Sequence, residues 1–189
     1  MNVTVFEAIN ITKKYRNTLA LNQVSMSVMQ GDIYGFIGEN GAGKTTMIRL
    51  LTGLAEPTTG KIALFGESNK KLAKQRERIG CIIESPSLYL DMTAYENLEV
   101  QRLQRGIPGK GCIDNALALV GLKDTGKKKA KDFSLGMRQR LALAIALLGN
   151  PEFLVLDEPI NGLDPTGIIE LRNLLKRLNK ERGITILIS

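Results

Sequence analysis

Apolar and polar positions alternate with different spacings along the chain, and each change of spacing marks an expected element. Residues 4–12 and 23–29 carry apolar and β-branched residues at a period of about two, which predicts half-buried strands. Residues 32–37 are mostly apolar, as expected for a strand buried in a sheet. Residues 44–52 change to helical spacing, and Gly53 is a typical helix end. The chain therefore opens with strands, a glycine-rich loop and a helix.

Residues 84–148 differ in character from the segments on either side. Prolines and glycines recur here between stretches of helical spacing. Residues 114–120 place apolar side chains on one helical face, and residues 141–148 are apolar on every face, which predicts a buried helix. We therefore expect a helical subdomain at residues 84–148, inserted into an α/β unit.

The α/β pattern resumes after this segment. Residues 153–156 form a short apolar run that is typical of a buried strand. Asp164 followed by Pro165 predicts a helix start, because aspartate caps free amides of the first turn and proline has no amide to leave unpaired. Residues 1–83 and 149–189 are therefore expected to form one core.

Residues 38–45, between the strand expected at 32–37 and the following helix, carry the pattern Gly-x-x-x-x-Gly-Lys-[Ser/Thr]. Glycines let successive backbone amides turn toward one anion, and the N-terminus of the next helix points its positive end at the same place. In such loops the lysine reaches the β- and γ-phosphates and the hydroxyl binds Mg²⁺. The pattern therefore predicts a nucleotide site with bound Mg²⁺. The residues expected to hold the nucleotide are Gly38, Asn40, Gly41, Gly43, Lys44, Thr45 and Thr46, with Thr45 also a metal ligand.

Two carboxylates, Asp157 and Glu158, follow the apolar run at residues 153–156. A carboxylate at the carboxyl end of a buried strand can bind the Mg²⁺ of a phosphate-loop site, which is the role expected of Asp157. Glu158 is then placed to act as general base for an attacking water, a contribution of about 10²–10⁴ in rate. An Asp-Glu pair alone is more often a cap or a solvated group, so this interpretation depends on the loop at residues 38–45.

A third motif, Phe-Ser-Leu-Gly-Met-Arg-Gln-Arg, lies at residues 133–140, directly before the expected buried helix. It resembles the signature motif of ABC ATPases, whose commoner form is Leu-Ser-Gly-Gly-Gln-x-Gln-Arg. The turn at residues 53–60 and the D-loop-like residues 161–164 also match this family, and the match covers essentially the whole chain. The resemblance implies an α/β P-loop NTPase (RecA-like) core with an N-terminal antiparallel β subdomain and an inserted α-helical subdomain.

The resemblance also implies residue roles and partners. Tyr15 matches the aromatic residue that stacks on adenine, and Asp164 belongs to the D-loop. Ser134 and Gly136 match residues that contact the γ-phosphate of ATP held by a second protomer, so that a head-to-tail dimer closes on ATP and opens after hydrolysis. In the family this movement drives a transmembrane permease subunit. We therefore expect ATP and Mg²⁺ as cofactors, a homodimer or a paired ATPase subunit, and a cytoplasmic position, peripheral on the inner face of the cell membrane.

Glu84 departs from the family pattern, because most relatives have glutamine after the corresponding strand. Glutamate keeps an oxygen ligand for Mg²⁺ or water, but it adds negative charge and accepts hydrogen bonds only. We therefore assign Glu84 a catalytic and metal-binding role beside Glu158. Glu84 and the variant signature together resemble the ATPases of bacitracin and lantibiotic-type peptide exporters and immunity systems. This implies export of a peptide antibiotic or lantibiotic-like substrate and a role in antibiotic resistance.

Members of the family carry a switch histidine shortly after a strand like the one expected at residues 184–188. The chain ends at Ser189 and contains no histidine. We therefore expect a C-terminally truncated ATPase that hydrolyses ATP poorly. A second family feature, the stretch at residues 86–100, touches the membrane subunit; here Tyr89 and Tyr95 either form such an interface or pack within the helical subdomain.

Composition narrows the possible chemistry. The 189 residues include 26 Lys and Arg and 19 Asp and Glu, and the net charge of +7 suits an anionic partner. The absence of histidine excludes Ser-His-Asp and Cys-His catalysis and histidine metal sites within these residues. Cys81 and Cys112 form no CxxC pair, and we expect both to be buried or half-buried. The longest apolar run, residues 141–148, is far shorter than the ~20 residues that span a bilayer.

Other phosphate-loop functions fit the sequence less well. Chromosome and repair ATPases of this kind insert a long coiled coil between loop and signature, and residues 46–134 hold no sustained heptads. Ribosome-acting relatives join two such domains in one chain, and a small-molecule kinase has no need of a signature helix. The remaining alternatives are a non-transport ABC-type ATPase and an ATP-gated interaction module, and no nucleic-acid partner is expected. The lysine-rich stretches at residues 70–78 and 127–131 are interpreted first as solvated surface and second as a lipid-headgroup contact.

Overall fold

The computed structural model describes residues 3–84 and 87–189, whose strands form two four-stranded sheets, one antiparallel and one parallel. The antiparallel sheet has the order β2-β1-β4-β5, with β1 at Thr4–Tyr15, β2 at Thr18–Met29, β4 at Thr59–Leu64 and β5 at Glu67–Ser68. The parallel sheet has the order β3-β8-β7-β6, with β3 at Ile33–Gly35, β6 at Ile79–Ile82, β7 at Phe153–Leu156 and β8 at Thr185–Ile188. This combination confirms the predicted α/β class with an N-terminal antiparallel sheet.

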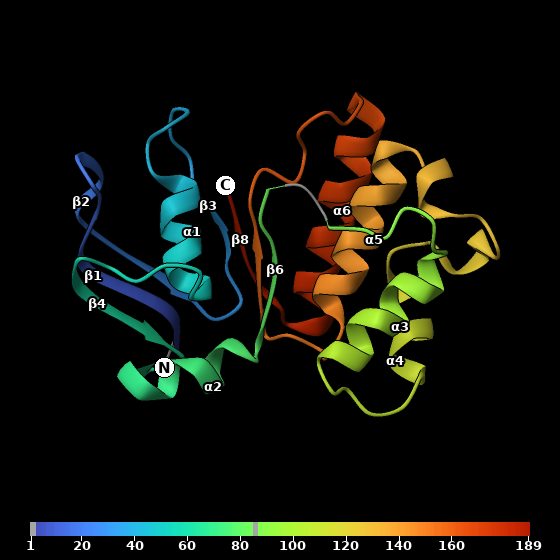
Figure 1. Ribbon diagram of the computed structural model, residues 1–189, viewed down its shortest axis with the longest axis horizontal. Helices are drawn as coiled ribbons and strands as arrows, with labels where there is room; N and C mark the ends of the chain where they lie inside the picture. Colours follow the sequence, from blue (N-terminus) through green and yellow to red (C-terminus); the bar gives the residue numbers. More distant parts are fainter. Residues whose placement is uncertain (1–2, 85–86) are drawn as a thin grey trace.

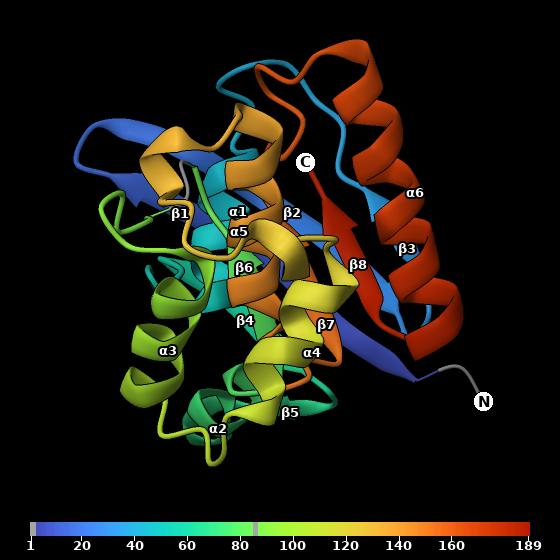
Figure 2. The same ribbon diagram turned by 90° about the vertical axis from the view of Figure 1, so that its right-hand side faces the viewer.

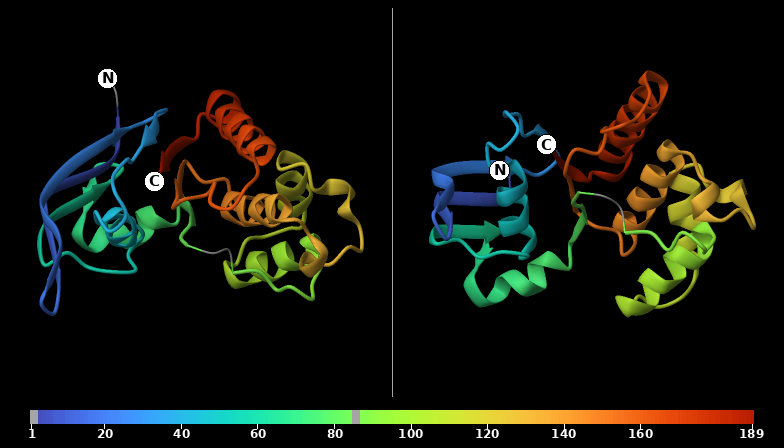
Figure 3. Two further views of the ribbon diagram at one scale, coloured as in Figure 1. Left: turned by 90° about the horizontal axis from the view of Figure 1, so that it is seen from above. Right: turned by 45° about the horizontal axis from the view of Figure 1, so that its top comes forward.

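The helices lie between and beside these sheets. They are α1 (Lys44–Thr52), α2 (Leu72–Arg76), α3 (Ala94–Gln104), α4 (Gly111–Leu119), α5 (Leu135–Leu147) and α6 (Pro165–Arg182). Figure 1 shows the antiparallel sheet and α1 at one end, the parallel strands in the middle, and α5 and α6 at the other end. Figure 2 shows α3 and α4 beside α5, and both views in Figure 3 place these helices at the opposite end of the molecule from β1 and β2.

Strand β7 connects the two hydrophobic cores because each of its faces is buried. Phe153 and Val155 join the core around α1, whereas Leu154 and Leu156 join the core formed with α5 and α6. All four side chains are fully buried, which explains why this strand is a continuous apolar run rather than an alternating one. Burial of each such side chain contributes about 1.5–3 kcal/mol, so β7 is held firmly and its carboxyl end is a rigid platform.

Helix α1 has the predicted bounds, and both of its ends have local causes. Gly43 precedes it and Gly53 follows it, and each has a left-handed backbone conformation. At its C-terminal end the Arg76 guanidinium donates to the carbonyl oxygens of Leu51 and Leu50, at 3.2 and 3.5 Å, where helix carbonyls lack an internal partner. The helix is therefore fixed at the end opposite to the phosphate loop.

The first two strands are longer than predicted. The antiparallel pairing of β1 and β2 continues to Tyr15 opposite Thr18, where Arg16 makes the turn with a φ of 48°. Register shifts interrupt this part of the pairing, and most side chains near the turn are exposed on both faces. A strand without a buried face shows no apolar period, which is why the alternation in the sequence ends earlier.

Helices α3, α4 and α5 fall within residues 84–148, where the sequence predicts a helical subdomain. Helix α5 also packs against β6, and its buried side chains share one core with α6 and β7. The division into an α/β core at residues 1–83 and 149–189 and a separate helical subdomain stays a prediction.

Candidate nucleotide site

The phosphate loop joins β3 to α1 and has the backbone that a tight anion cradle requires. Gly41 and Gly43 have φ values of 83° and 92°, a region that favours glycine. A Cβ atom on Gly43 would lie 2.6 Å from the Ala20 carbonyl oxygen, so this position excludes any larger residue. Among the described residues no side chain caps α1, and its first amides are therefore free for an anion.

Lys44 curls back over this loop. Its Nζ atom donates to the carbonyl oxygens of Gly38 and Glu39 at 2.7 and 3.0 Å, which ties the ammonium to the backbone of the loop. Asn40 and Gly41 are exposed, and Thr45 and Thr46 are half-buried in the first turn of α1. The predicted loop residues thus lie together between β3 and the first turn of α1.

A cavity of about 360 Å³ lies next to this loop, between the parallel sheet and the start of α5. It brings together four predicted site residues from separate parts of the chain, Thr45, Glu84, Asp157 and Glu158. Leu135, Gln139 and Asn161 complete its lining. Glu84 and Asp157 follow β6 and β7 closely, and the carboxyl ends of neighbouring parallel strands are the usual place for a ligand.

Asp157 is buried, and its orientation is fixed from two sides. Its amide donates to the Ile82 carbonyl oxygen at 2.8 Å, and its Oδ1 accepts from the Ser189 hydroxyl at 2.7 Å. The same Ser189 oxygen accepts the Glu158 amide at 3.0 Å. Ser189 therefore ties the two carboxylate residues to β8, a role that no local sequence pattern indicates.

Glu158 and Glu84 both have a left-handed backbone, with φ values of 47° and 60°. Such a conformation costs about 1–3 kcal/mol for residues other than glycine, and strained positions of this kind cluster at functional sites. Glu158 also accepts a hydrogen bond at Oε2 from the side-chain amide of Asn161. Both strained residues line the cavity where the chain leaves β6 and β7.

Gln139 is a site residue that the sequence analysis missed. Its side chain lies in the buried part of α5, with 8% of the residue exposed, and lines the same cavity. Its Oε1 is fully enclosed and has no hydrogen-bond partner among residues 3–84 and 87–189. Buried amide oxygens normally have a donor, so Gln139 contributes an unpaired acceptor in the wall of the cavity, although the oxygen itself is enclosed. Arg138 and Arg140 flank Gln139 in the sequence, and this polar run is typical of a solvent-exposed helix face, so nothing local indicates that Gln139 is buried.

Four predicted nucleotide contacts lie outside both the phosphate loop and the lining of this cavity. Tyr15 is 41% exposed at the end of β1, with the Lys13 Nζ 4.7 Å from its ring centroid. Ser134 caps α5, as predicted, and its Oγ accepts the Met137 amide at 3.2 Å. Asp164 caps α6 by accepting the Gly167 amide at 3.0 Å. Gly136 lies in the first turn of α5. None of these four residues lines the cavity beside the phosphate loop.

The possible metal ligands in the cavity are hydroxyl and carboxylate oxygens, and such ligands suit Mg²⁺ better than a softer metal. Within the described ranges there is no group of three or more His, Cys, Asp or Glu residues that could hold a metal by itself. Mg²⁺ is commonly bound by one or two protein oxygens together with substrate phosphates and water, and Thr45 with Asp157 provides such a partial set.

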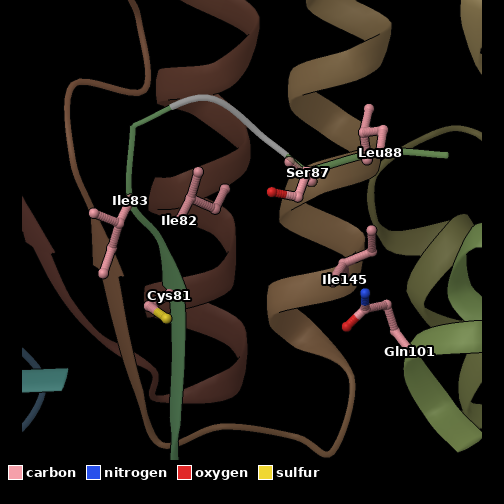
Figure 4. Close-up of a pocket in the computed structure, with 8 residues that line it drawn as sticks. Cys81, Ile82, Ile83, Ser87, Leu88, Gln101 and Ile145 are labelled. Atoms are coloured by element: carbon pink, nitrogen blue, oxygen red, sulfur yellow. The ribbon is translucent and has the colours of Figure 1, made fainter. Parts of the chain in front are cut away.

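A second cavity of about 170 Å³ lies between β6 and helices α3 and α5. Figure 4 shows Cys81, Ile82 and Ile83 on the strand side and Gln101 and Ile145 on the helix side. The expected burial of Cys81 is wrong: this residue is exposed, because β6 is an edge strand, whereas Cys112 is half-buried as expected.

In the stretch at residues 87–100 one tyrosine is exposed and the other is half-buried. Tyr89 is 45% exposed, and Tyr95 packs against the helical core. Asn97, which is 1% exposed, accepts the Tyr89 amide at 2.8 Å and donates to its carbonyl oxygen at 3.0 Å. Pro86, the first residue of the stretch named from the sequence, lies outside the described residues.

A phosphate loop on a parallel sheet, paired carboxylates on the neighbouring strand end and a capped signature helix define a nucleotide-binding P-loop cassette. The family model of the ABC transporter matches residues 21–161, and the chain belongs to this family. The bacitracin transport ATP-binding protein BcrA of Bacillus licheniformis is 51% identical over 98% of this chain and 61% of its own length. The lantibiotic transport ATP-binding protein SrtF of Streptococcus pyogenes is 43% identical over 95% of this chain and 77% of its own length.

Solved structures agree with this assignment. CbiO1 of Clostridium perfringens, part of the ABC transporter complex cbiONQ, superposes with a TM-score of 0.89 at 30% identity, over 98% of this chain and 78% of its own. The ATP-binding cassette MJ0796, in a dimeric post-hydrolysis state with ADP and Pi, gives 0.82 at 27% identity, over 97% of this chain and 86% of its own. The chain spans about 60% of the length of the BcrA proteins.

Proposed function

We propose that this chain binds ATP with Mg²⁺ and hydrolyses it as the ATP-binding subunit of an exporter for a peptide antibiotic or lantibiotic-like substrate. The observation that carries the ATPase part is the cavity beside the phosphate loop, where Thr45, Asp157 and Glu158 meet. The names of the bacitracin and lantibiotic transport relatives support the class of substrate.

Each residue of the site has a distinct task in this proposal. The loop amides and Lys44 bind the phosphates, and Tyr15 stacks on the adenine. Thr45 and Asp157 hold Mg²⁺, with Glu84 nearby as a further oxygen ligand or water contact. When bound, Mg²⁺ neutralises charge on the β- and γ-phosphates. Glu158 accepts the proton of the attacking water, and Asn161 orients its carboxylate.

Ser134, Gly136 and Asp164 act on ATP held by a second protomer. The exposed N-terminus of α5 at Ser134 favours this assignment, because it leaves that end of the helix open to a second protomer. Amides at a helix N-terminus stabilise an anion by about 0.3–2 kcal/mol. The dimeric state of the related cassette MJ0796 supports a dimer that closes on ATP.

The proposed membrane partner is a transmembrane permease subunit. In the described part of the chain no helix combines the length and the apolar character that crossing a membrane requires. We place the chain on the inner face of the cell membrane through contact with that subunit, and the exposed segment around Tyr89 and Leu90 is the proposed contact.

Substituting Lys44 by methionine tests the nucleotide site directly. The variant keeps an unbranched side chain, one atom shorter, but loses the ammonium group, so affinity for a fluorescent ATP analogue with Mg²⁺ should fall at least tenfold, about 1.4 kcal/mol for one charge-assisted contact. Titration of the analogue into both proteins measures this loss. Equal affinity in both proteins, or no binding by the parent protein, contradicts the proposed function.

Substituting Tyr89 by alanine tests the permease contact. Tyr89 is exposed while its backbone is held by Asn97, so removal of its ring should leave the melting temperature within ~2 °C and weaken co-purification with the permease. Tyr95→Ala is the matched control: it removes a packed ring and should lower the melting temperature without a selective loss of assembly. Normal assembly of the Tyr89 variant contradicts this contact.

A further inference from the structure

Glu84 is paired with a basic residue, Arg49, that has no role in the proposed mechanism. The Arg49 Nη2 donates to the Glu84 Oε1 in a direct ion pair. Within residues 3–84 and 87–189, it is the only ion pair that includes a residue lining the nucleotide cavity. The partly exposed positions of both side chains, 43% for Arg49 and 60% for Glu84, leave the pair free to open.

Arg49 also occupies a defined place relative to the proposed metal ligands. It lies four residues after Thr45 in α1, so both side chains are on the same face of the helix, one turn apart. Glu84 is in contact with both groups of residues. Its carboxylate is bound to Arg49, and the residue lines the cavity together with Thr45 and Asp157. The carboxylate that Arg49 holds therefore belongs to one of the proposed Mg²⁺ ligands.

The charge in the cavity affects whether the Glu84 carboxylate binds Arg49 or a metal ion. Glu84, Asp157 and Glu158 place three carboxylates around one cavity, next to the site proposed for a triphosphate. An uncharged glutamine at position 84 could still accept a hydrogen bond from Arg49, but without the charge that strengthens an ion pair. A glutamate is held more strongly by Arg49, and that pairing keeps its oxygen from a bound metal.

We propose that Arg49 competes with Mg²⁺ for the Glu84 carboxylate and thereby lowers the affinity of the nucleotide site for Mg²⁺. Arg49 is thus a positioning residue that acts through Glu84. The inference rests on the proposed function, since it concerns the metal that accompanies the bound nucleotide. Glutamate at position 84, where most relatives have glutamine, then has a physical consequence. The added carboxylate is held by Arg49 until the ion pair opens.

The test is a Mg²⁺ titration of the protein loaded with a fluorescent, non-hydrolysable ATP analogue. The measured quantity is the Mg²⁺ concentration at half of the metal-dependent fluorescence change. Arg49→Gln should lower this concentration about two- to fivefold, the range typical of an exposed ion pair. In the Glu84→Gln background the same substitution should change it by less than about 1.5-fold, because the oxygen for which Arg49 competes then carries no charge.

Two controls separate this competition from a general effect of charge. Arg49→Lys keeps the positive charge and should return the Mg²⁺ concentration to within about twofold of the parent value. Arg78→Gln removes the same charge from an ion pair with Glu152 of similar exposure, 38% and 52%, located before β6 and β7 rather than after them. It should leave the Mg²⁺ titration unchanged.

Each outcome decides the matter. A larger shift for Arg49→Gln in the presence of Glu84 than in its absence supports the competition. Equal shifts in both backgrounds, an equal shift for Arg78→Gln, or weaker Mg²⁺ binding in Arg49→Gln overturns it while leaving the proposed nucleotide site intact. Failure of the parent protein to bind the analogue overturns the proposed function itself.

Discussion

Glu158→Gln is expected to slow ATP hydrolysis by about 10²–10⁴-fold while ATP binding is retained. The amide keeps the shape of the side chain and an oxygen that can accept the Asn161 hydrogen bond, but it cannot take a proton from water. Phosphate release and binding of a fluorescent ATP analogue measure the two effects separately. Glu152→Gln is the matched control, because it neutralises an exposed carboxylate at the opposite end of β7 and should leave turnover unchanged.

The same variant should accumulate a closed dimer with Mg-ATP. If the separation of the protomers requires hydrolysis, blocking the proton transfer leaves them joined, and the mass in solution should change from monomer to dimer on addition of Mg-ATP. A rate within tenfold of the parent rate would show that Glu158 is not the base. Normal ATP binding without a dimer would contradict the action of Ser134 on a second protomer and favour an ATP-gated module.

Elements with strong local signals were predictable from the sequence. The bounds of α1 follow from helical spacing between two glycines, and those of β7 from an apolar run whose faces are both buried. The start of α6 is predicted by Asp164 and Pro165, which are found as its cap and its first residue. In each case the residues that decide the element lie within it or next to it.

The rest depends on contacts between distant segments. Nothing near Glu84 indicates that its partner is Arg49, since the pair forms only when β6 ends beside α1. Ser189 likewise meets Asp157 because β8 pairs with β7. Cys81 is exposed on β6, which lies at the edge of the parallel sheet. The order of strands in a sheet cannot be predicted from the residues of one strand. The phosphate loop was recognisable locally, whereas the cavity around it was not.

Gly136→Ala is expected to stabilise the isolated protomer and to abolish its ATP-driven assembly. A Cβ atom on Gly136 would meet only the Leu163 Cδ2 at 3.9 Å and the Ser134 Oγ at 4.0 Å, so the folded chain has room for the methyl group. Alanine is the better helix former, and the free energy of unfolding should rise by about 0.5–1 kcal/mol. The fold of one protomer therefore gives no reason for glycine at this position.

We expect Gly136 to be required for a close approach by a group from outside its own chain. If the γ-phosphate held by a second protomer contacts the first turn of α5, the added methyl group blocks that contact, and turnover should fall on the order of 10²-fold, as when a transition-state donor is lost. Gly111→Ala provides the control, because Gly111 begins α4, a Cβ there would have no neighbour within 4 Å, and no proposed contact involves it. Thermal melts, phosphate release and mass in solution with Mg-ATP distinguish the outcomes. A Gly136→Ala protein that is stable, active and dimeric would place the second phosphate contact elsewhere.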